Sequence, residues 1–284
     1  ASAFGLRDAI ALAPELPDTF FDPKERRIDA PNSVGTAFLH VGCVMQFAFP
    51  QVHDATIRML QRARLSVVIP QNQGCCGAIG VHAGEMDFGR ELAKRNIAAF
   101  ERSGADVYVV DAAGCGSALK EYGTLFAGDA KWAERAQKFS QRVRDICEVL
   151  DASELDPKIG SLDVTVTYQE PCHLVHAQRV SAAPRRLLRQ IPGLQLIEMN
   201  ESALCCGSAG IYNLTRPAMS AKLRARKSGN ITATNAAVVA TANPGCAMQV
   251  AAGLREAGYP AKVRHVVELL DDAYAAYGAA ITRD

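Results

Sequence analysis

Eight of the nine cysteines in this 284-residue sequence form two sets with the same order: a single cysteine, an adjacent pair followed by glycine, and another single cysteine. The first set, quartet 1, consists of Cys43, Cys75, Cys76 and Cys115. The second set, quartet 2, consists of Cys172, Cys205, Cys206 and Cys246. The first interval is 32 positions (43 to 75) in quartet 1 and 33 (172 to 205) in quartet 2, and the last is 39 (76 to 115) and 40 (206 to 246). This agreement indicates an internal duplication with a period of about 130 residues, the length of a duplicated half.

The quartets are suited to metal or redox chemistry. Adjacent thiols are poor partners for a disulfide, because the bond requires a Cβ geometry that neighbouring residues rarely offer. Four thiolates can hold a tetrahedral zinc ion or an iron–sulfur cluster. Structural zinc sites generally use cysteines two to four residues apart, a spacing that neither quartet has. Adjacent side chains diverge, which favours a larger cluster, and Gly77 and Gly207 let the backbone turn tightly beside it. An iron–sulfur cluster is therefore the preferred interpretation for at least one quartet, with zinc as the alternative.

Short runs rich in β-branched residues precede the cysteines and predict buried parallel strands. In the first half the runs are TAFLHVG, LSVVIP and DVYVVDAAG, and in the second DVTVTYQEP, LQLIEM and AAVVATANPG. Helical stretches such as HDATIRMLQRAR and PRRLLRQ lie between them, so the sequence predicts two tandem duplicated α/β half-domains with parallel sheets. Because ligands gather beyond the carboxyl ends of such strands, the four cysteines of a quartet are expected to converge there.

Composition and charge fit a compact protein without a nucleic-acid partner. The chain has 31 Lys and Arg against 30 Asp and Glu, and 49% of its residues are hydrophobic. It has no apolar run of the roughly 18 residues that crossing a bilayer needs, and its start lacks the order of a secretory signal. We expect a cytoplasmic protein. Peripheral attachment to the inner membrane through partner proteins is an open alternative. The expected organisation is a linker or arm over residues 1–35, a first cysteine-rich domain over 36–155 and a second over 156–284.

Several other residues have a possible role and a simpler alternative. Cys147 falls on a helical stripe with Val143, Ile146 and Leu150, so it is predicted to be structural. His82 and Tyr212 each lie six residues after a pair and could tune a cluster by a hydrogen bond, or be ordinary loop residues. For His173 and His176 beside Cys172, metal ligation is the less favoured interpretation. The other candidates in this group are predicted to be packing or surface residues: His40, His53 and His265. A solvated helix face is predicted for the basic group Arg216, Lys222, Arg224, Arg226 and Lys227.

The cysteine pattern resembles the cysteine-rich CCG domain of the heterodisulfide reductase family, present as its usual tandem pair. The stretches GCGSALKEYG (114–123), LCCGSAGIYNLTRP (204–217), TANPGC (241–246) and VRHVVELL (263–270) resemble the iron–sulfur subunits of glycolate oxidases. The likeness runs from about residue 36 to the C-terminus, and the related lactate-utilisation proteins match these stretches less closely.

This resemblance implies an electron carrier in a flavoprotein complex that oxidises a 2-hydroxy acid such as glycolate. It implies one or two clusters of the [4Fe–4S] type, with the eight quartet cysteines as ligands and no catalytic residue in this chain. The implied partners are flavoprotein subunits, a ferredoxin-like domain and a quinone acceptor. No flavin fingerprint is present in the sequence, and the two-cluster ferredoxin motif C-x-x-C-x-x-C that such subunits usually carry is also missing.

Two rival functions remain open at this point. A cluster-based heterodisulfide or thiol reductase would use a cluster as its catalytic site, but the CxxC that ends the motif in heterodisulfide reductases is missing after both Cys115 and Cys246. A scaffold with structural zinc in one or both quartets would have no redox role. Iron and sulfide content separates the second rival from an electron carrier, and activity with a disulfide separates the first.

Overall fold

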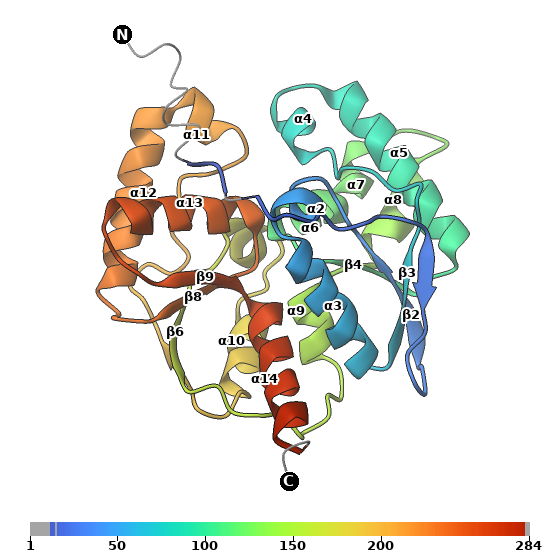
Figure 1. Ribbon diagram of the computed structural model, residues 1–284. Helices are drawn as coiled ribbons and strands as arrows, with labels where there is room; N and C mark the ends of the chain where they lie inside the picture. Colours follow the sequence, from blue (N-terminus) through green and yellow to red (C-terminus); the bar gives the residue numbers. More distant parts are fainter. Residues whose placement is uncertain (1–11, 15, 282–284) are drawn as a thin grey trace.

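All six runs that were predicted to be strands form strands in the computed structural model, which describes residues 12–14 and 16–281. They are short and mostly buried, as aliphatic and β-branched runs covered by helices on both faces must be. The predicted α/β fold class with parallel sheets is therefore confirmed. Figure 1 shows two α/β halves side by side, the first in blue to green and the second in yellow to red.

The first half contains a five-stranded sheet, and the bounds of its elements are as follows. They are β1 (Arg26–Ile28), β2 (Gly35–Leu39), α2 (Val44–Ala48), α3 (Pro50–Arg62), β3 (Leu65–Ile69), α4 (Ala78–His82), α5 (Met86–Ser103), β4 (Val107–Val110), α6 (Ala113–Lys120), α7 (Tyr122–Leu125), α8 (Ala133–Ser140), β5 (Val143–Asp145) and α9 (Ile146–Asp151).

The second half contains a four-stranded sheet. Its elements are β6 (Val164–Tyr168), the π-helical turn η2 (His173–Ala177), α10 (Ala182–Arg189), β7 (Leu194–Ile197), α11 (Tyr212–Thr215), α12 (Pro217–Thr232), β8 (Val238–Thr241), α13 (Pro244–Glu256), β9 (Lys262–His265) and α14 (Val266–Ile281).

The two sheets share one topology. The strand orders are β1-β3-β2-β4-β5 and β7-β6-β8-β9, so β2, β3, β4 and β5 correspond to β6, β7, β8 and β9. All pairings are parallel except that of β1, which runs antiparallel to β3 with Arg26 opposite Ile69. β1 lies within the segment predicted as an arm, part of which is outside the described residues. The shared order places equivalent loops of both halves at the same edge of their sheets.

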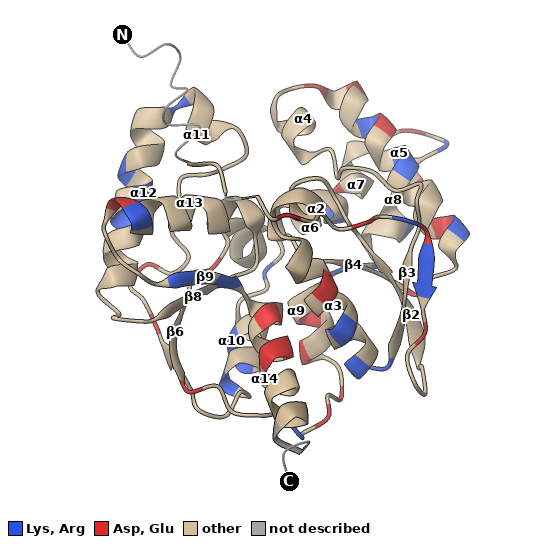
Figure 2. Ribbon diagram, in the orientation of Figure 1, with Lys and Arg blue, Asp and Glu red and all other residues tan. Residues whose placement is uncertain are grey.

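The halves are joined through helices and through their central strands. α14 packs against α3, where Arg58 and Asp271 form an ion pair of 2.6 Å, and α10 packs against α9. Figure 2 shows charged residues on the adjoining parts of α3 and α14. Beyond β4 and β8, the amide of Ala113 donates a hydrogen bond of 3.0 Å to the carbonyl oxygen of Ala242. One hydrophobic cluster includes residues of both sheets, so the halves share a core.

Cys147 is buried in α9 at 1% exposure, in agreement with its predicted structural role. The helical stripe proposed for it was wrong at its first member, because Val143 belongs to β5 and the helix begins at Ile146. A short edge strand followed at once by a helix gives buried positions that mimic a helical period. Asp145 caps this helix by accepting a hydrogen bond of 2.9 Å from the amide of Cys147.

Candidate functional site

The structure places each quartet at the carboxyl ends of three adjacent strands of its sheet. In quartet 1, single cysteines follow β2 and β4, and the pair follows β3. Quartet 2 repeats this arrangement after β6, β8 and β7. Parallel strands end at a common edge, so residues more than 30 positions apart in sequence meet there.

Within quartet 1 the sulfur atoms contact one another. The Sγ atoms of Cys43 and Cys75 lie 3.7 Å apart, and Cys76 interacts with both Cys75 and Cys115. The amide of Gly77 points at the Cys75 sulfur from 3.5 Å, in a left-handed conformation with φ of 80°. Only glycine adopts that conformation without strain, which explains why the pair is followed by this residue type.

Quartet 2 has the same internal arrangement. Cys205 interacts with Cys172 and Cys206, and Cys206 interacts with Cys246. The amide of Gly207, with φ of 93°, lies 3.3 Å from the Cys205 sulfur. A Cβ at this glycine would come within 2.6 Å of a main-chain oxygen of α12, so space as well as conformation demands glycine here.

The thiols of each quartet depend strongly on one another for their protonation. Hydrogen bonds from Cys43 and Cys76 lower the pKa of Cys75 to about 2, and the same bond to Cys75 raises the pKa of Cys43. In quartet 2, hydrogen bonds from the neighbouring thiols likewise lower the pKa of Cys205 to about 2. Hydrogen bonds from Cys76 and Cys206 also lower the pKa of Cys115 and Cys246, so two thiolates in each quartet form easily while the pKa of the other two thiols is raised. A cationic group between the sulfurs would relieve the repulsion between thiolates.

Both quartets line one cavity of about 210 Å³ between the two halves. Each half also contributes an imidazole, and the rings of His82 and His173 stack with their centroids 6.2 Å apart. His82 lines the cavity, whereas Tyr212, its counterpart after the second pair, does not, so the ordinary loop role fits Tyr212. The walls are formed largely by uncharged segments, and α2 and α4 contain no charged residue (Figure 2).

The histidines near Cys172 differ in their contacts. His173 has Nδ1 3.7 Å from the Cys172 sulfur, which is a weak polar contact. Burial lowers the pKa of His173, so its neutral form is favoured. His176 instead contacts the carbonyl oxygen of Ala203 at 3.2 Å and does not line the cavity.

The remaining three histidines are buried, as a packing role requires. His40 lies against quartet 1, with Nδ1 2.8 Å from the hydroxyl of Tyr108. Nδ1 of His53 lies 2.7 Å from Asp111, a fully buried carboxylate at the cavity. Burial alone would raise the pKa of Asp111 and lower that of His53, but their mutual attraction outweighs it and shifts both the other way.

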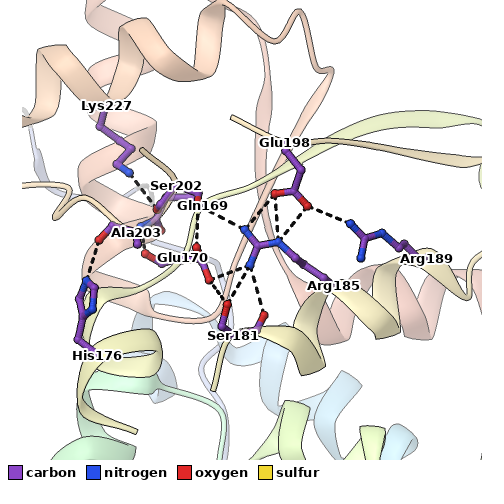
Figure 3. Close-up of polar contacts among 10 residues, drawn as sticks. All are labelled: Gln169, Glu170, His176, Ser181, Arg185, Arg189, Glu198, Ser202, Ala203 and Lys227. Carbon is purple, nitrogen blue, oxygen red and sulfur yellow. Dashed lines mark hydrogen bonds and ion pairs between the residues drawn. The ribbon is translucent and has the colours of Figure 1, made fainter. Parts of the chain in front are cut away.

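A network of polar side chains holds the chain segment that leads into Cys172, as Figure 3 shows. Glu170, two residues before Cys172, is 5% exposed and accepts hydrogen bonds of 2.7 Å from Ser181, Ser202 and Arg185. Burial would raise the pKa of Glu170, but these donors lower it to about 2. The network therefore ties the loop before Cys172 to the loop before the second pair.

The basic group formed by Arg216 and four residues of α12 contains an unexpected buried member. Lys222 and Arg226 are exposed, as predicted for a solvated face. Lys227 is 1% exposed, so the prediction was wrong for this residue. Its Nζ donates hydrogen bonds of 2.7 and 3.0 Å to the carbonyl oxygens of Glu201 and Ser202. Figure 3 shows the bond to Ser202. The sequence offered no signal for this burial beyond the helical periodicity of the segment.

Each quartet offers a donor set that suits a thiophilic inorganic group. Among the described residues, no three His, Cys, Asp or Glu side chains form a group that could hold a single metal ion. The sulfurs of a quartet instead form a chain of contacts at the cavity. This arrangement fits a group of several atoms better than one tetrahedral ion.

Fold and site together define a duplicated α/β protein whose two halves face each other with four thiols each. The chain belongs to the cysteine-rich CCG domain family, whose model matches it twice, over residues 37–120 and 166–251.

Similar curated proteins carry related names. The chain is 40% identical over 276 residues to a probable glycolate oxidase iron–sulfur subunit of Bacillus subtilis and 33% identical over 235 residues to the glycolate oxidase iron–sulfur subunit of Escherichia coli. These matches cover 94% and 82% of this chain but only 62% and 56% of those proteins. It is also 30% identical to lactate utilization protein A of Shouchella clausii, covering 82% of this chain and 97% of that protein. The glycolate oxidase relatives are thus substantially longer than the chain described here.

A solved structure supports the fold. A hypothetical protein from Helicobacter pylori superposes with a TM-score of 0.61 at 11% identity, over 91% of this chain and 54% of that one. None of the helices in the described part of the chain combines the length and the apolarity that crossing a bilayer requires.

Proposed function

We propose that this chain is an iron–sulfur electron-transfer subunit of a flavin-dependent 2-hydroxy acid dehydrogenase or oxidase of the glycolate type. The observation that carries the proposal is the convergence of eight cysteines from a duplicated fold on a single cavity. The names of the relatives give the proposal its direction, since two are glycolate oxidase iron–sulfur subunits. Flavoprotein subunits are the proposed partners and a quinone is the proposed final acceptor.

In this proposal the eight quartet cysteines are the ligands of one or two clusters of the [4Fe–4S] type. An iron–sulfur cluster, when bound, takes up and releases one electron at a time. Cys75 and Cys205 already favour the thiolate form, and the amides of Gly77 and Gly207 point at those sulfurs. These donors hold the sulfurs in place, so little rearrangement accompanies a change of charge.

The test is a preparation of the protein under anaerobic conditions with quantification of iron, acid-labile sulfide and zinc. We expect iron and sulfide in equal amounts, with the total falling by half in Cys75→Ala and in Cys205→Ala if both quartets are occupied. Cys147→Ala is the matched control and should keep the full content. Zinc at one ion per quartet without sulfide would contradict the proposal and support a scaffold.

A second experiment tests whether the chain carries electrons between a flavoprotein partner and a quinone. The iron–sulfur absorption should bleach when the protein is mixed with its flavoprotein partner and glycolate or lactate, and recover when a quinone analogue is added. Turnover of a disulfide by the isolated protein with a reduced dye, without any response to a 2-hydroxy acid, would instead support the reductase.

A further inference from the structure

The duplication carries a difference in charge at one buried position. Asn96 on α5 follows the second cysteine of its pair by 20 positions (76 to 96), and Lys227 on α12 follows its own by 21 (206 to 227). Their exposures are 0% and 1%. The two residues are therefore equivalents in the repeat, one a neutral amide and the other an ammonium.

Both residues fasten the loop that leads to the adjacent cysteines. Asn96 accepts a hydrogen bond of 2.8 Å from the amide of Gly74 and donates one of 3.0 Å to the carbonyl oxygen of Cys75. Lys227 donates to the carbonyl oxygens of Glu201 and Ser202. Since an amide fastens this loop in the first half, the positive charge in the second half is not needed for that task alone.

The charge of Lys227 is not neutralised by its hydrogen-bond partners, which are both main-chain carbonyls. The Glu201 carboxylate is engaged by Arg226 and Asn230 on the protein surface. Burial lowers the pKa of Lys227 below its usual value, and attraction to the thiolates of Cys206, Cys246 and Cys205 offsets this shift only in part. The ammonium thus acts on quartet 2 from a region where water screens it poorly.

A second difference between the halves works on quartet 1. His40 interacts with Cys115, and its equivalent three residues before Cys172 is the neutral Gln169. The His40→Gln variant therefore separates the effect of this imidazole on quartet 1 from the effect of Lys227 on quartet 2.

We propose that Lys227 raises the reduction potential of a cluster held by quartet 2 above that of a cluster held by quartet 1, so that electrons pass from the first half to the second. The inference rests on the proposed function, because it requires a cluster in each quartet. In this step the group in quartet 1 is oxidised by one electron and the group in quartet 2 is reduced by one, with no bond formed or broken. A reduced flavin of the partner supplies the electron and a quinone receives it. A nearby cation stabilises the more negative, reduced form of a cluster and therefore raises its reduction potential.

The experiment is a potentiometric titration of the anaerobic protein at pH 8, followed by electron paramagnetic resonance. Cys205→Ala retains only the cluster of quartet 1 and Cys75→Ala only that of quartet 2. We expect the quartet 2 cluster to have the higher midpoint potential by about tenfold in the equilibrium constant, which is about 59 mV for one electron. His40→Gln, titrated in parallel, removes the imidazole from the comparison.

Substitutions of the lysine then identify the cause. Lys227→Gln should lower the midpoint of the quartet 2 cluster by about the same tenfold factor and leave quartet 1 unchanged. Lys227→Arg, which keeps the charge, should remain close to the wild type. Arg226→Gln, an exposed neighbour on the same helix, is the matched control and should shift neither midpoint by more than about threefold.

Equal midpoints, or a higher midpoint for quartet 1 in both the wild-type and His40→Gln backgrounds, would overturn the inference and leave the proposed function intact. Absence of clusters from the wild-type protein would overturn the proposed function itself. If Lys227→Gln binds no iron in quartet 2, the midpoint potentials of the two single-cluster proteins and of Lys227→Arg still test the inference.

Discussion

The buried carboxylate of Glu170 offers the sharpest test of how this fold supports quartet 2. Glu170→Gln keeps the shape of the side chain but removes the charge that Arg185, Ser181 and Ser202 stabilise. The fall in the pKa of Glu170 from 4.5 to about 2 corresponds to about 3 kcal/mol of stability at neutral pH. That figure lies at the lower end of the cost of breaking a buried ion pair, roughly 3–5 kcal/mol.

The pH dependence has a definite sign. A carboxylate with a lowered pKa in the folded state stabilises the protein fully above its unfolded value, here 4.5, and loses this effect as the pH falls towards about 2. Glu170→Gln should therefore be about 3 kcal/mol less stable than the wild type at pH 7, and the difference should shrink steadily below pH 4.5.

The assay is equilibrium denaturation of the reduced, metal-free protein with a denaturant series at each pH. Glu198→Gln is the control, because Glu198 binds the same arginine from a more exposed position and should cost no more than about 1 kcal/mol. A loss in Glu170→Gln that is the same at pH 7 and pH 3.5, or no larger than that of the control, would refute this account of the network.

Three further substitutions test other parts of the site. Gly207→Ala should cost at least about 2 kcal/mol of stability and reduce iron binding, because its φ is 93° and its Cβ would meet a main-chain oxygen. Gly229→Ala, at a glycine in open space on α12, is the control in the same denaturation assay and should be neutral or stabilising by up to about 1 kcal/mol. Asp111→Asn should cost about 3–5 kcal/mol between pH 4 and 6.5, as a pH series of melting curves would measure. The cost should diminish as the pH falls below 3.8 towards the lowered pKa of Asp111, and as the pH rises above 6.5 through the raised pKa of His53. Cys147→Ala should lower stability by about 1–2 kcal/mol without changing the iron content, in contrast to any quartet cysteine.

The central architecture was predictable because it follows from local pattern and repetition. Buried parallel strands consist of short aliphatic runs, and the same order of runs and cysteines occurs twice, so each half supports the interpretation of the other. The edge strands β1, β5 and β9 were missed, since runs of three or four residues such as Val143–Asp145 carry no period of their own. Their pairing is decided by the neighbouring strand.

The polar support of the quartets was less predictable. Asp111 directly follows β4 and Glu170 lies two residues after β6, and nothing local distinguishes them from exposed loop residues. Lys227 sits in a run of basic residues in which Lys222 and Arg226 are exposed and Arg224 is only partly buried. Burial of these groups depends on partners brought from distant segments, such as His53 and Arg185, and only the assembled fold reveals them.

The shared cavity also depends on how the two central strands meet. The amide of Ala113 donates to the carbonyl of Ala242, and the symmetric bond from the second half cannot form because the equivalent residue is Pro244, which has no N–H. The neighbouring amide of Gly114 is satisfied by the side chain of Asn243 at 2.9 Å, and Asn243 also contacts the Cys246 sulfur at 3.5 Å. One side chain therefore connects the last strand end of quartet 1 to a sulfur of quartet 2. The duplicated halves have diverged at the contact where their cysteines come together, which is where a difference between the two sites would have its effect.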